Sequence, residues 1–319
     1  MNRKIMSVVV LAGLVGCDGG GDEAQEARAF AADCTRWQCG YNAAEINGEP
    51  FSELNVNGLA NSSGMKIVGF VSPTNLLGYK LTLVGDELVA KGGLLLGDLK
   101  GAALIGSTIL VKMGSGLTVP VLIAGTESVP SWASGGAPIT AYTLVYTDLN
   151  LVQSNVCKGS LLEPLTSAVT FLGGETYNDA TKTVNAGQNG WFTLACAGSA
   201  AAKMKLMNYG PNSNFDGQGH AATPLQRQAT LKMITADYCG TGTSYTATGT
   251  PILWTNASHT VTPNPNTPAG DFEAAWGPNG ATCLETPRRP DLAEAMTCNL
   301  PACTPGHVQG TEWSTVNVE

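Results

Sequence analysis

Between residues 50 and 200, apolar and polar positions alternate over short stretches that end at glycine or in a polar turn. Alternation of this kind, together with β-branched residues, is typical of strands that bury one face. The pattern predicts strands at 66–71, 79–84, 108–113, 118–124, 139–146, 168–172 and 191–195. A polar stretch rich in Gly and Asn between the last two predicts a hairpin.

A faint five-residue period runs through residues 97–111 and places Leu99, Leu104 and Ile109 at the centres of three units. Central aliphatic residues would point inward in a pentapeptide β-solenoid. Three irregular units are few for such a repeat. They favour a β-meander interrupted by glycines.

Helical periodicity is found mainly in the C-terminal third. Ser199 is a candidate N-cap, and Thr223-Pro224 begins a second helix that we expect to end near Cys239, with Gly240 as its C′ residue. A third, short helix is expected to start at Pro290. The apolar positions of the second helix are Leu225, Ala229, Met233 and Ile234.

These patterns predict a mainly β fold with a smaller α+β C-terminal domain. With about 150 residues per domain, 319 residues suggest two domains, here at 34–155 and 156–319. Gly (39) and Pro (17) are frequent and only 13% of residues are charged, which favours turn-rich β structure. The net charge of −8 and the absence of Lys/Arg runs give nucleic-acid binding no electrostatic basis.

The N-terminus has the pattern of an export signal. A basic start is followed by twelve uncharged residues, Ile5 to Gly16, which would span about 18 Å as a helix, well short of a ~30 Å bilayer core. Leu14-Val15-Gly16-Cys17 resembles the bacterial lipoprotein signal. The resemblance implies that residues 1–16 are cleaved and that Cys17 is acylated, which would anchor the chain to a lipid bilayer.

Residues 17–33 lack an apolar pattern and are predicted to form a flexible, acidic tether with a reach of about 20–24 Å. Cleavage would remove Arg3 and Lys4 and leave a net charge of −10. An acidic body is repelled by anionic headgroups, so the acyl chains must hold it at the membrane. Asp18 favours retention in the inner membrane under a sorting rule that is not universal. The sequence therefore does not decide which membrane leaflet holds the anchor, and the cell surface remains an alternative.

Nine cysteines are present, and removal of the lipid-bearing Cys17 leaves eight. An even number in an exported chain predicts four disulfides, although eight cysteines allow 105 pairings. The spacing of the pairs does not favour zinc. Sequential pairing gives Cys34–Cys39, Cys157–Cys196, Cys239–Cys283 and Cys298–Cys303.

Three blocks in the C-terminal third carry a family resemblance: Ala236-Asp237-Tyr238-Cys239, the stretch 245–252 and the stretch 272–283. In this order they resemble the ADYC domain of exported bacterial proteins, over about residues 190–290. The resemblance implies no activity, because the family has none established.

The motif itself admits a structural interpretation. Asp237 would oppose the helix dipole in a last helical turn, so we expect a compensating cation or hydrogen bonds from the Gly240–Gly242 turn. Tyr238 would fill a gap and place its hydroxyl on a partner. Cys239 would link the helix end to Cys283.

Two functional hypotheses remain. The first is an envelope lipoprotein without catalytic activity, which binds an envelope protein or glycan or serves surface architecture, with no cofactor and no metal. The second is an exported hydrolase or transferase of an undescribed type that uses Asp237, His220 or Glu273. The two hypotheses are separated by whether these side chains converge in one pocket. No HExxH or Gly-x-Ser-x-Gly motif is present.

Three weaker patterns have equally good structural interpretations. Residues 212–217 match the first half of a calcium loop but lack its closing Glu. Asp271 and Glu273 would share a strand face, as a glycosidase-type carboxylate pair does. Trp132 and Trp276 would suit a carbohydrate platform or an ordinary core.

Overall fold

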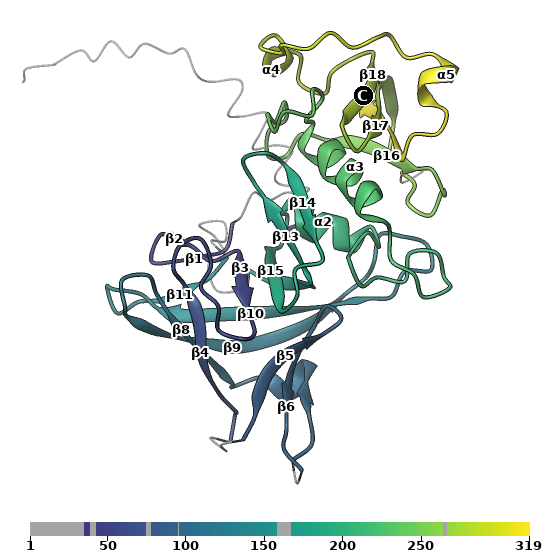
Figure 1. Cartoon of the computed structure of the whole chain (residues 1–319). Coiled ribbons are helices and arrows are strands. Elements are labelled where there is room, and N and C mark those ends of the chain that lie inside the picture. The colour runs from purple at the N-terminus through teal and green to yellow at the C-terminus, as the bar shows by residue number, and fades with distance from the viewer. Residues whose placement is uncertain (1–34, 39–42, 75–77, 95, 158–166, 264–266) are drawn as a thin grey trace, which may run out of the picture.

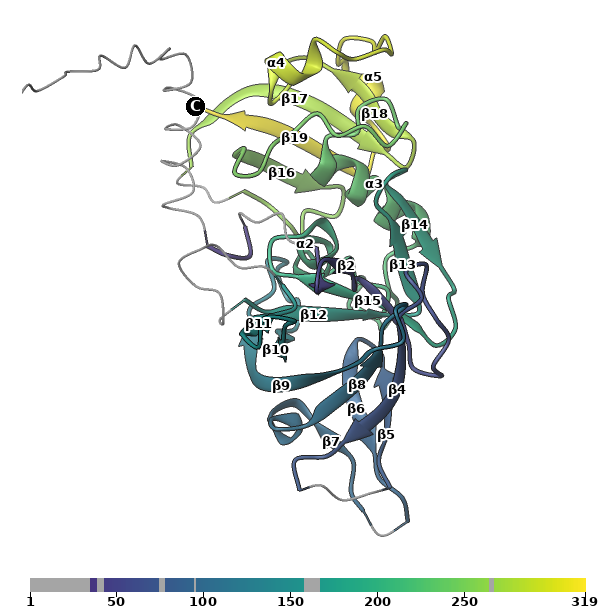
Figure 2. The same ribbon diagram turned by 90° about the vertical axis from the view of Figure 1, so that its left-hand side faces the viewer.

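The computed structural model describes residues 35–38, 43–74, 78–94, 96–157, 167–263 and 267–319. The predicted signal peptide, Cys17, the tether and the predicted Cys34–Cys39 pair lie outside these residues. Figures 1 and 2 show an elongated body. A large sheet lies in the middle, a small sheet lies at one end, and the C-terminal helices and strands lie at the other end.

The large sheet is antiparallel and has the strand order β3-β15-β12-β10-β9-β8-β4, with β11 also paired to β10. Its longest strands, β9 and β10, are paired over most of their length with one register shift. The strands are β3 (Glu53–Asn55), β4 (Lys66–Val71), β8 (Thr108–Lys112), β9 (Thr118–Val129), β10 (Ile139–Thr147), β11 (Gln153–Asn155), β12 (Val169–Gly173) and β15 (Trp191–Cys196).

Three smaller elements surround this sheet. The three-stranded sheet of β5 (Lys80–Val84), β6 (Glu87–Lys91) and β7 (Leu99–Lys100) packs its apolar side into the same core. A hairpin of β13 (Glu175–Asn178) and β14 (Thr183–Ala186) stands beside the helices (Figure 1), and β1 (Glu45–Ile46) pairs with β2 (Glu49–Pro50).

The C-terminal part is built on a four-stranded antiparallel sheet of order β16-β19-β17-β18. It comprises β16 (Ile252–Asn256), β17 (Ala269–Gly277), β18 (Gly280–Leu284) and β19 (Trp313–Val318). Trp276 and Trp313 are fully buried in its core. The helices are α2 (Ala200–Leu206), α3 (Pro224–Thr235), α4 (Pro290–Ala293) and α5 (Pro305–Val308), with a 3-10 turn, η1 (Gly101–Leu104).

Helix α3 joins the two parts. It begins as predicted, with a capping box between Thr223 and Gln226 and Pro224 in the first turn. It ends at Thr235, four residues before the expected Cys239, because Ala236 adopts a left-handed conformation with φ of 49°. Figures 1 and 2 show α3 between the β13–β14 hairpin and the C-terminal sheet.

The mainly β class is confirmed, and so are the strands predicted from alternation, of which 66–71 matches β4 in full. Residues 97–111 form β7, η1 and β8, which is a strand, a turn and a strand and not a solenoid. The large sheet contains β12 and β15 as well as β3, β4 and β8 to β11, so the domain boundary predicted at residue 155 runs through it. Of the four apolar positions noted in this helix, Leu225 is 66% exposed and the other three are buried.

The predicted Cys157–Cys196 disulfide is confirmed, with Cα atoms 5.6 Å apart. The predicted pairs Cys239–Cys283 and Cys298–Cys303 are wrong: Cys239 bonds to Cys298, and Cys283 bonds to Cys303. The cause is the chain after β18, which folds back along that strand. The Leu284 N–H donates to the Pro301 carbonyl at 3.0 Å and brings Cys303 beside Cys283.

The Cys157–Cys196 bridge closes a loop of 39 residues across the large sheet. Replacing both cysteines by Ala should lower the free energy of unfolding by about 4 kcal/mol, since the open chain gains entropy when unfolded. Guanidinium unfolding measures this. Peptide mapping without reduction should also recover Cys239 joined to Cys298, and a peptide joining Cys239 to Cys283 would contradict this fold.

Candidate functional site

The Ala-Asp-Tyr-Cys motif follows α3 directly and packs against the β17–β18 turn. Ala236 is fully buried and turns the chain out of the helix. The carbonyl of Tyr238 accepts the Ala281 N–H at 2.9 Å. A Cβ at Gly280, whose φ is +114°, would lie 2.5 Å from the same carbonyl oxygen, so only glycine allows this contact. The backbone of the motif is therefore fixed against the β17–β18 turn independently of its side-chain contacts.

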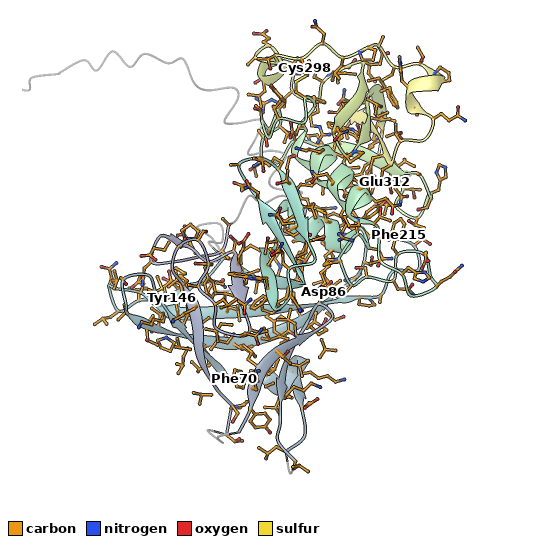
Figure 3. The ribbon with its side chains drawn as sticks, viewed as in Figure 1. Phe70, Asp86, Tyr146, Phe215, Cys298 and Glu312 are labelled. Atoms are coloured by element: carbon orange, nitrogen blue, oxygen red, sulfur yellow. A yellow bond between two sulfur atoms is a disulfide. The ribbon has the colours of Figure 1, made fainter. Side chains whose placement is uncertain are left out.

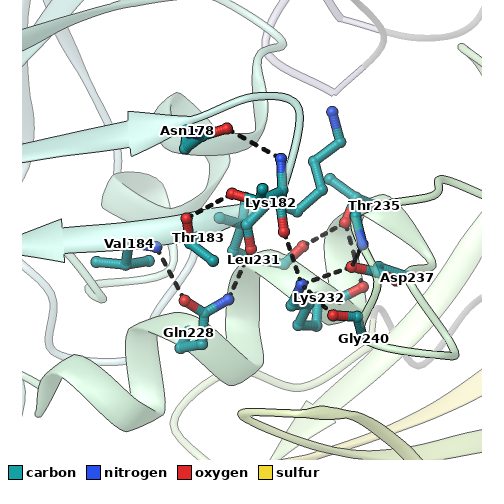
Figure 4. A network of polar contacts seen from close by, with 12 residues as sticks. Asn178, Lys182, Thr183, Val184, Gln228, Leu231, Lys232, Thr235, Asp237 and Gly240 are labelled. Atoms are coloured by element: carbon teal, nitrogen blue, oxygen red, sulfur yellow. Dashed lines mark hydrogen bonds and ion pairs between the residues drawn. The ribbon is translucent and has the colours of Figure 1, made fainter.

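Asp237 is completely buried and forms an ion pair with Lys232 of α3, with Oδ2 2.6 Å from Nζ. The same Oδ2 accepts the Gly242 N–H at 2.8 Å. Lys232 Nζ also donates to the Thr181 carbonyl at 3.0 Å and to the Gly240 carbonyl at 3.2 Å (Figure 4). Both expected compensations, the cation and the turn amides, are present. The network ties the motif to the β13–β14 turn.

Tyr238 belongs to a second network. Its hydroxyl donates to Glu273 Oε1 at 2.5 Å and accepts the Arg288 N–H at 3.2 Å. Arg288 holds Glu273 at both oxygens, at 2.6 and 2.9 Å, and donates to the Met233 carbonyl of α3 at 3.1 Å. Burial, reinforced by the Glu273 carboxylate, raises the pKa of Tyr238. Tyr238 is thus a neutral donor to a carboxylate that is already paired.

Aromatic rings enclose this second network. Trp276 is stacked on Tyr238 with ring centroids 5.1 Å apart and an interplanar angle of 23°. The Arg288 guanidinium lies 5.7 Å from the centre of the Trp276 ring, where a cation–π contact adds to its ion pair. Glu273 is thus fully buried, and both of its carboxylate oxygens are bonded within this network.

A third buried pair joins α3 to β13. Arg227 donates to Glu175 Oε2 through Nε at 2.7 Å, and Tyr177 donates to Glu175 Oε1 at 2.5 Å. Arg227 also donates to the Ala222 carbonyl. Burial raises the pKa of Glu175, against the opposing effects of Tyr177 and Arg227.

Helix α2 carries two lysines with lowered pKa. Lys205 Nζ donates to Thr170 Oγ1 and the Phe171 carbonyl, both at 2.8 Å, and to the Asp86 carbonyl at 3.3 Å, and burial lowers its pKa. Burial, together with the charge of Arg288, lowers the pKa of Lys203 to about 8. Lys205 fastens α2 to β12 of the large sheet.

The catalytic alternative required Asp237, His220 and Glu273 to converge, but their side chains make contacts in three separate groups. Asp237 and Glu273 are fully buried in different ion pairs. His220 lies on an exposed loop, with its side chain 76% exposed and Nδ1 2.6 Å from Asp216 Oδ2. That hydrogen bond lowers the pKa of Asp216 to about 2. Asp271 is exposed whereas Glu273 is buried, so they do not form a carboxylate pair.

The calcium-like loop uses its side chains to shape a turn. Asn214 Oδ1 accepts the Gly219 N–H at 2.6 Å, and Asp216 Oδ1 accepts the N–H groups of Gln218 and His220. Within the described ranges, no group of three or more His, Cys, Asp or Glu side chains is placed to hold a metal.

Trp132 and Trp276 do not form a shared platform. Trp276 lies in the core, and Trp132 stacks instead on Trp254, with centroids 6.0 Å apart.

The basic partners of these carboxylates were not predicted. Lys232, Arg227 and Arg288 are typical surface residues by type, and the apolar periodicity of α3 gives no sign that two of them are buried. One available signal was the buried acid Asp237 at a helix end, which requires a cation nearby. No pattern in the sequence pointed to Arg288.

Two clefts lie away from the motif. The first, of about 460 Å³, is lined by Asn57, Asn189, Trp191 and Asn212 among others. The second, of about 370 Å³, includes Asn185 in its lining. Neither is lined by Asp237, His220 or Glu273.

The fold and the motif define a mainly β, disulfide-crosslinked protein in which the motif fastens a helix between two sheets. Residues 101–290 match the ADYC domain, which is more than half of the chain. The chain belongs to the ADYC domain family. The match begins at residue 101 and not near 190, so it takes in β8 to β12 and β15 of the large sheet, and the β13–β14 hairpin. No curated protein and no solved structure matched the chain.

Asp237→Ala should lower the free energy of unfolding by about 3–5 kcal/mol, because it leaves the Lys232 ammonium buried without its partner. The double variant Asp237→Ala/Lys232→Met should cost less than the sum of the two single changes. Asp179→Ala is the matched control, since its carboxylate pairs with Lys182 but is 81% exposed, and it should melt close to the parent. If Asp237→Ala also melts like the parent, the motif is not structural.

Proposed function

We propose that this protein is a lipid-anchored envelope protein that acts by binding or as a structural element, and not by catalysis. The proposal depends on one observation. Asp237 of the motif, and Glu273, which is bonded to Tyr238 of the motif, are both fully buried in ion pairs. Carboxylates in that state lack access to a substrate. They stabilise the body that the anchor displays.

Export is supported by the disulfides. Three cysteine pairs are joined within the described residues, and such bonds persist in oxidising compartments outside the cytoplasm. The N-terminal pattern that ends at Cys17 supplies the export signal and the acylation site. In the part of the chain that the structure describes, no helix has the length and apolar character to cross a bilayer.

The tether and charge support display at a distance from the lipid. A reach of about 20–24 Å would hold the body clear of the headgroups, and its acidity would keep it from lying on an anionic surface. A surface presented in this way is available to an envelope protein or a glycan. The absence of basic runs gives nucleic acid no role.

The anchor is tested by Cys17→Ser in a bacterial host. The parent should take up labelled palmitate and sediment with membranes, whereas the variant should take up no label and either be released or remain uncleaved. Asp18→Asn is the control, because it leaves the acylated thiol in place and should retain the label. Palmitate on the Cys17→Ser protein would contradict the proposal.

A further inference from the structure

The first cleft, of about 460 Å³, opens where five segments of the chain meet. The turn after β3 contributes Asn57, the segment from the β14–β15 turn into β15 contributes Asn189, Gly190 and Trp191, and the loop after α2 contributes Asn212. The other two segments are 82–85, at the end of β5, and 173–174, at the end of β12. We call it the amide cleft. Its volume falls within the range of small-molecule sites, about 300–1,000 Å³.

The lining of the amide cleft has no charged side chain and is more polar than apolar, with Val56 and Leu83 among its apolar members. The side-chain amides of Asn57 and Asn189 and the indole N–H of Trp191 have no hydrogen-bond partner among the described residues. Asn212 uses its Nδ2 on Asp86 Oδ1 at 2.8 Å and on the Gly173 carbonyl at 2.9 Å, which leaves its carbonyl oxygen free. The cleft thus offers both donors and acceptors without a net charge.

A buried donor beside the cleft is unsatisfied. Asn55 is completely buried, its Oδ1 accepts the Asn57 N–H at 2.8 Å, and its Nδ2 has no partner among the described residues. A Cβ placed on Gly190 would lie 2.6 Å from Asn57 Nδ2 and 3.3 Å from Asn55 Nδ2. The glycine therefore keeps open the space onto which both amide nitrogens converge.

Hydrogen bonds to Asp86 fix one wall of the cleft. Asp86 Oδ1 accepts both the Gly173 N–H and the Asn212 amide, at 2.8 Å each, and its carbonyl accepts from Lys205. Figure 3 shows Asp86 where the β5–β6 hairpin meets the large sheet. Because these contacts fix the walls in advance, a ligand would lose little free energy to ordering the site.

We propose that the amide cleft binds a neutral saccharide. Sugar hydroxyls donate and accept hydrogen bonds, as side-chain amides do, and the half-buried Trp191 ring offers an apolar face to sugar C–H groups. An ionic ligand would find no opposite charge in the lining, and the nearby Asp86 carboxylate is already bonded. The inference deepens the proposed function, on which it rests for access to envelope glycans.

The test is titration of the full-length protein in detergent with neutral oligosaccharides of glucose, galactose, mannose and N-acetylglucosamine. Tryptophan fluorescence and saturation-transfer NMR report binding. At least one sugar should bind, and Asn57→Ala, Asn189→Ala and Trp191→Ala should each weaken it about tenfold or more. Asn185→Ala, an exposed asparagine of the second cleft, is the matched control and should bind like the parent.

Asn57 and Asn189 are exposed, so their variants should keep the parent's melting temperature and separate a binding defect from misfolding. Failure of every neutral sugar to bind, binding of acidic sugars alone, or equal binding by parent and Asn57→Ala would each overturn the inference. The outcome is independent of the anchor: saccharide binding does not need acylated Cys17, and release of the Cys17→Ser protein does not depend on the cleft.

Discussion

The buried charges of α3 are the constraint on which the rest of the structure depends. Arg227 and Lys232 lie on a helix packed between two sheets, where an unpaired cation would be prohibitively costly. Arg227 forms an ion pair with Glu175 of β13, and Lys232 forms one with Asp237 of the motif. The Met233 carbonyl of the same helix accepts from Arg288 of the C-terminal part. Each pair can form in only one relative placement of its elements, so the pairs specify how the sheets meet.

The family motif takes its meaning from this arrangement. Ala236 ends the helix, Asp237 neutralises Lys232, Tyr238 completes the Glu273–Arg288 pair, and Cys239 is bonded to Cys298. All four residues are used in holding α3 to its surroundings. Buried charges also support one wall of the amide cleft, because Asp86 bonds Gly173 and Asn212 of its lining and is itself bonded to Lys205.

The sequence predicted those features that local patterns determine. Alternation located the strands, and Thr223-Pro224 located the start of α3. Features that depend on how the chain folds back on itself were not predicted. The Cys283–Cys303 bridge forms because residues 285–303 fold back along β18, and the spacing of the cysteines in the sequence does not reveal this. Arg288 and Lys232 escaped notice because long basic side chains are usually solvated. The asparagines of the amide cleft are far apart in the chain: Asn57 and Asn189 meet through the pairing of β3 with β15, and Asn212 is placed by its bonds to Asp86 and Gly173.

Hydrogen exchange in the native state tests most directly whether the motif is a structural joint. The amides of Gly242, Ala281 and Arg288 donate to the carboxylate of Asp237, the carbonyl of Tyr238 and the hydroxyl of Tyr238, respectively. If the motif is the joint, these amides should open only with global unfolding and be protected as strongly as the amides between β9 and β10. Exchange many times faster than in that core, with the fold intact, would show that the motif moves independently and would contradict this account.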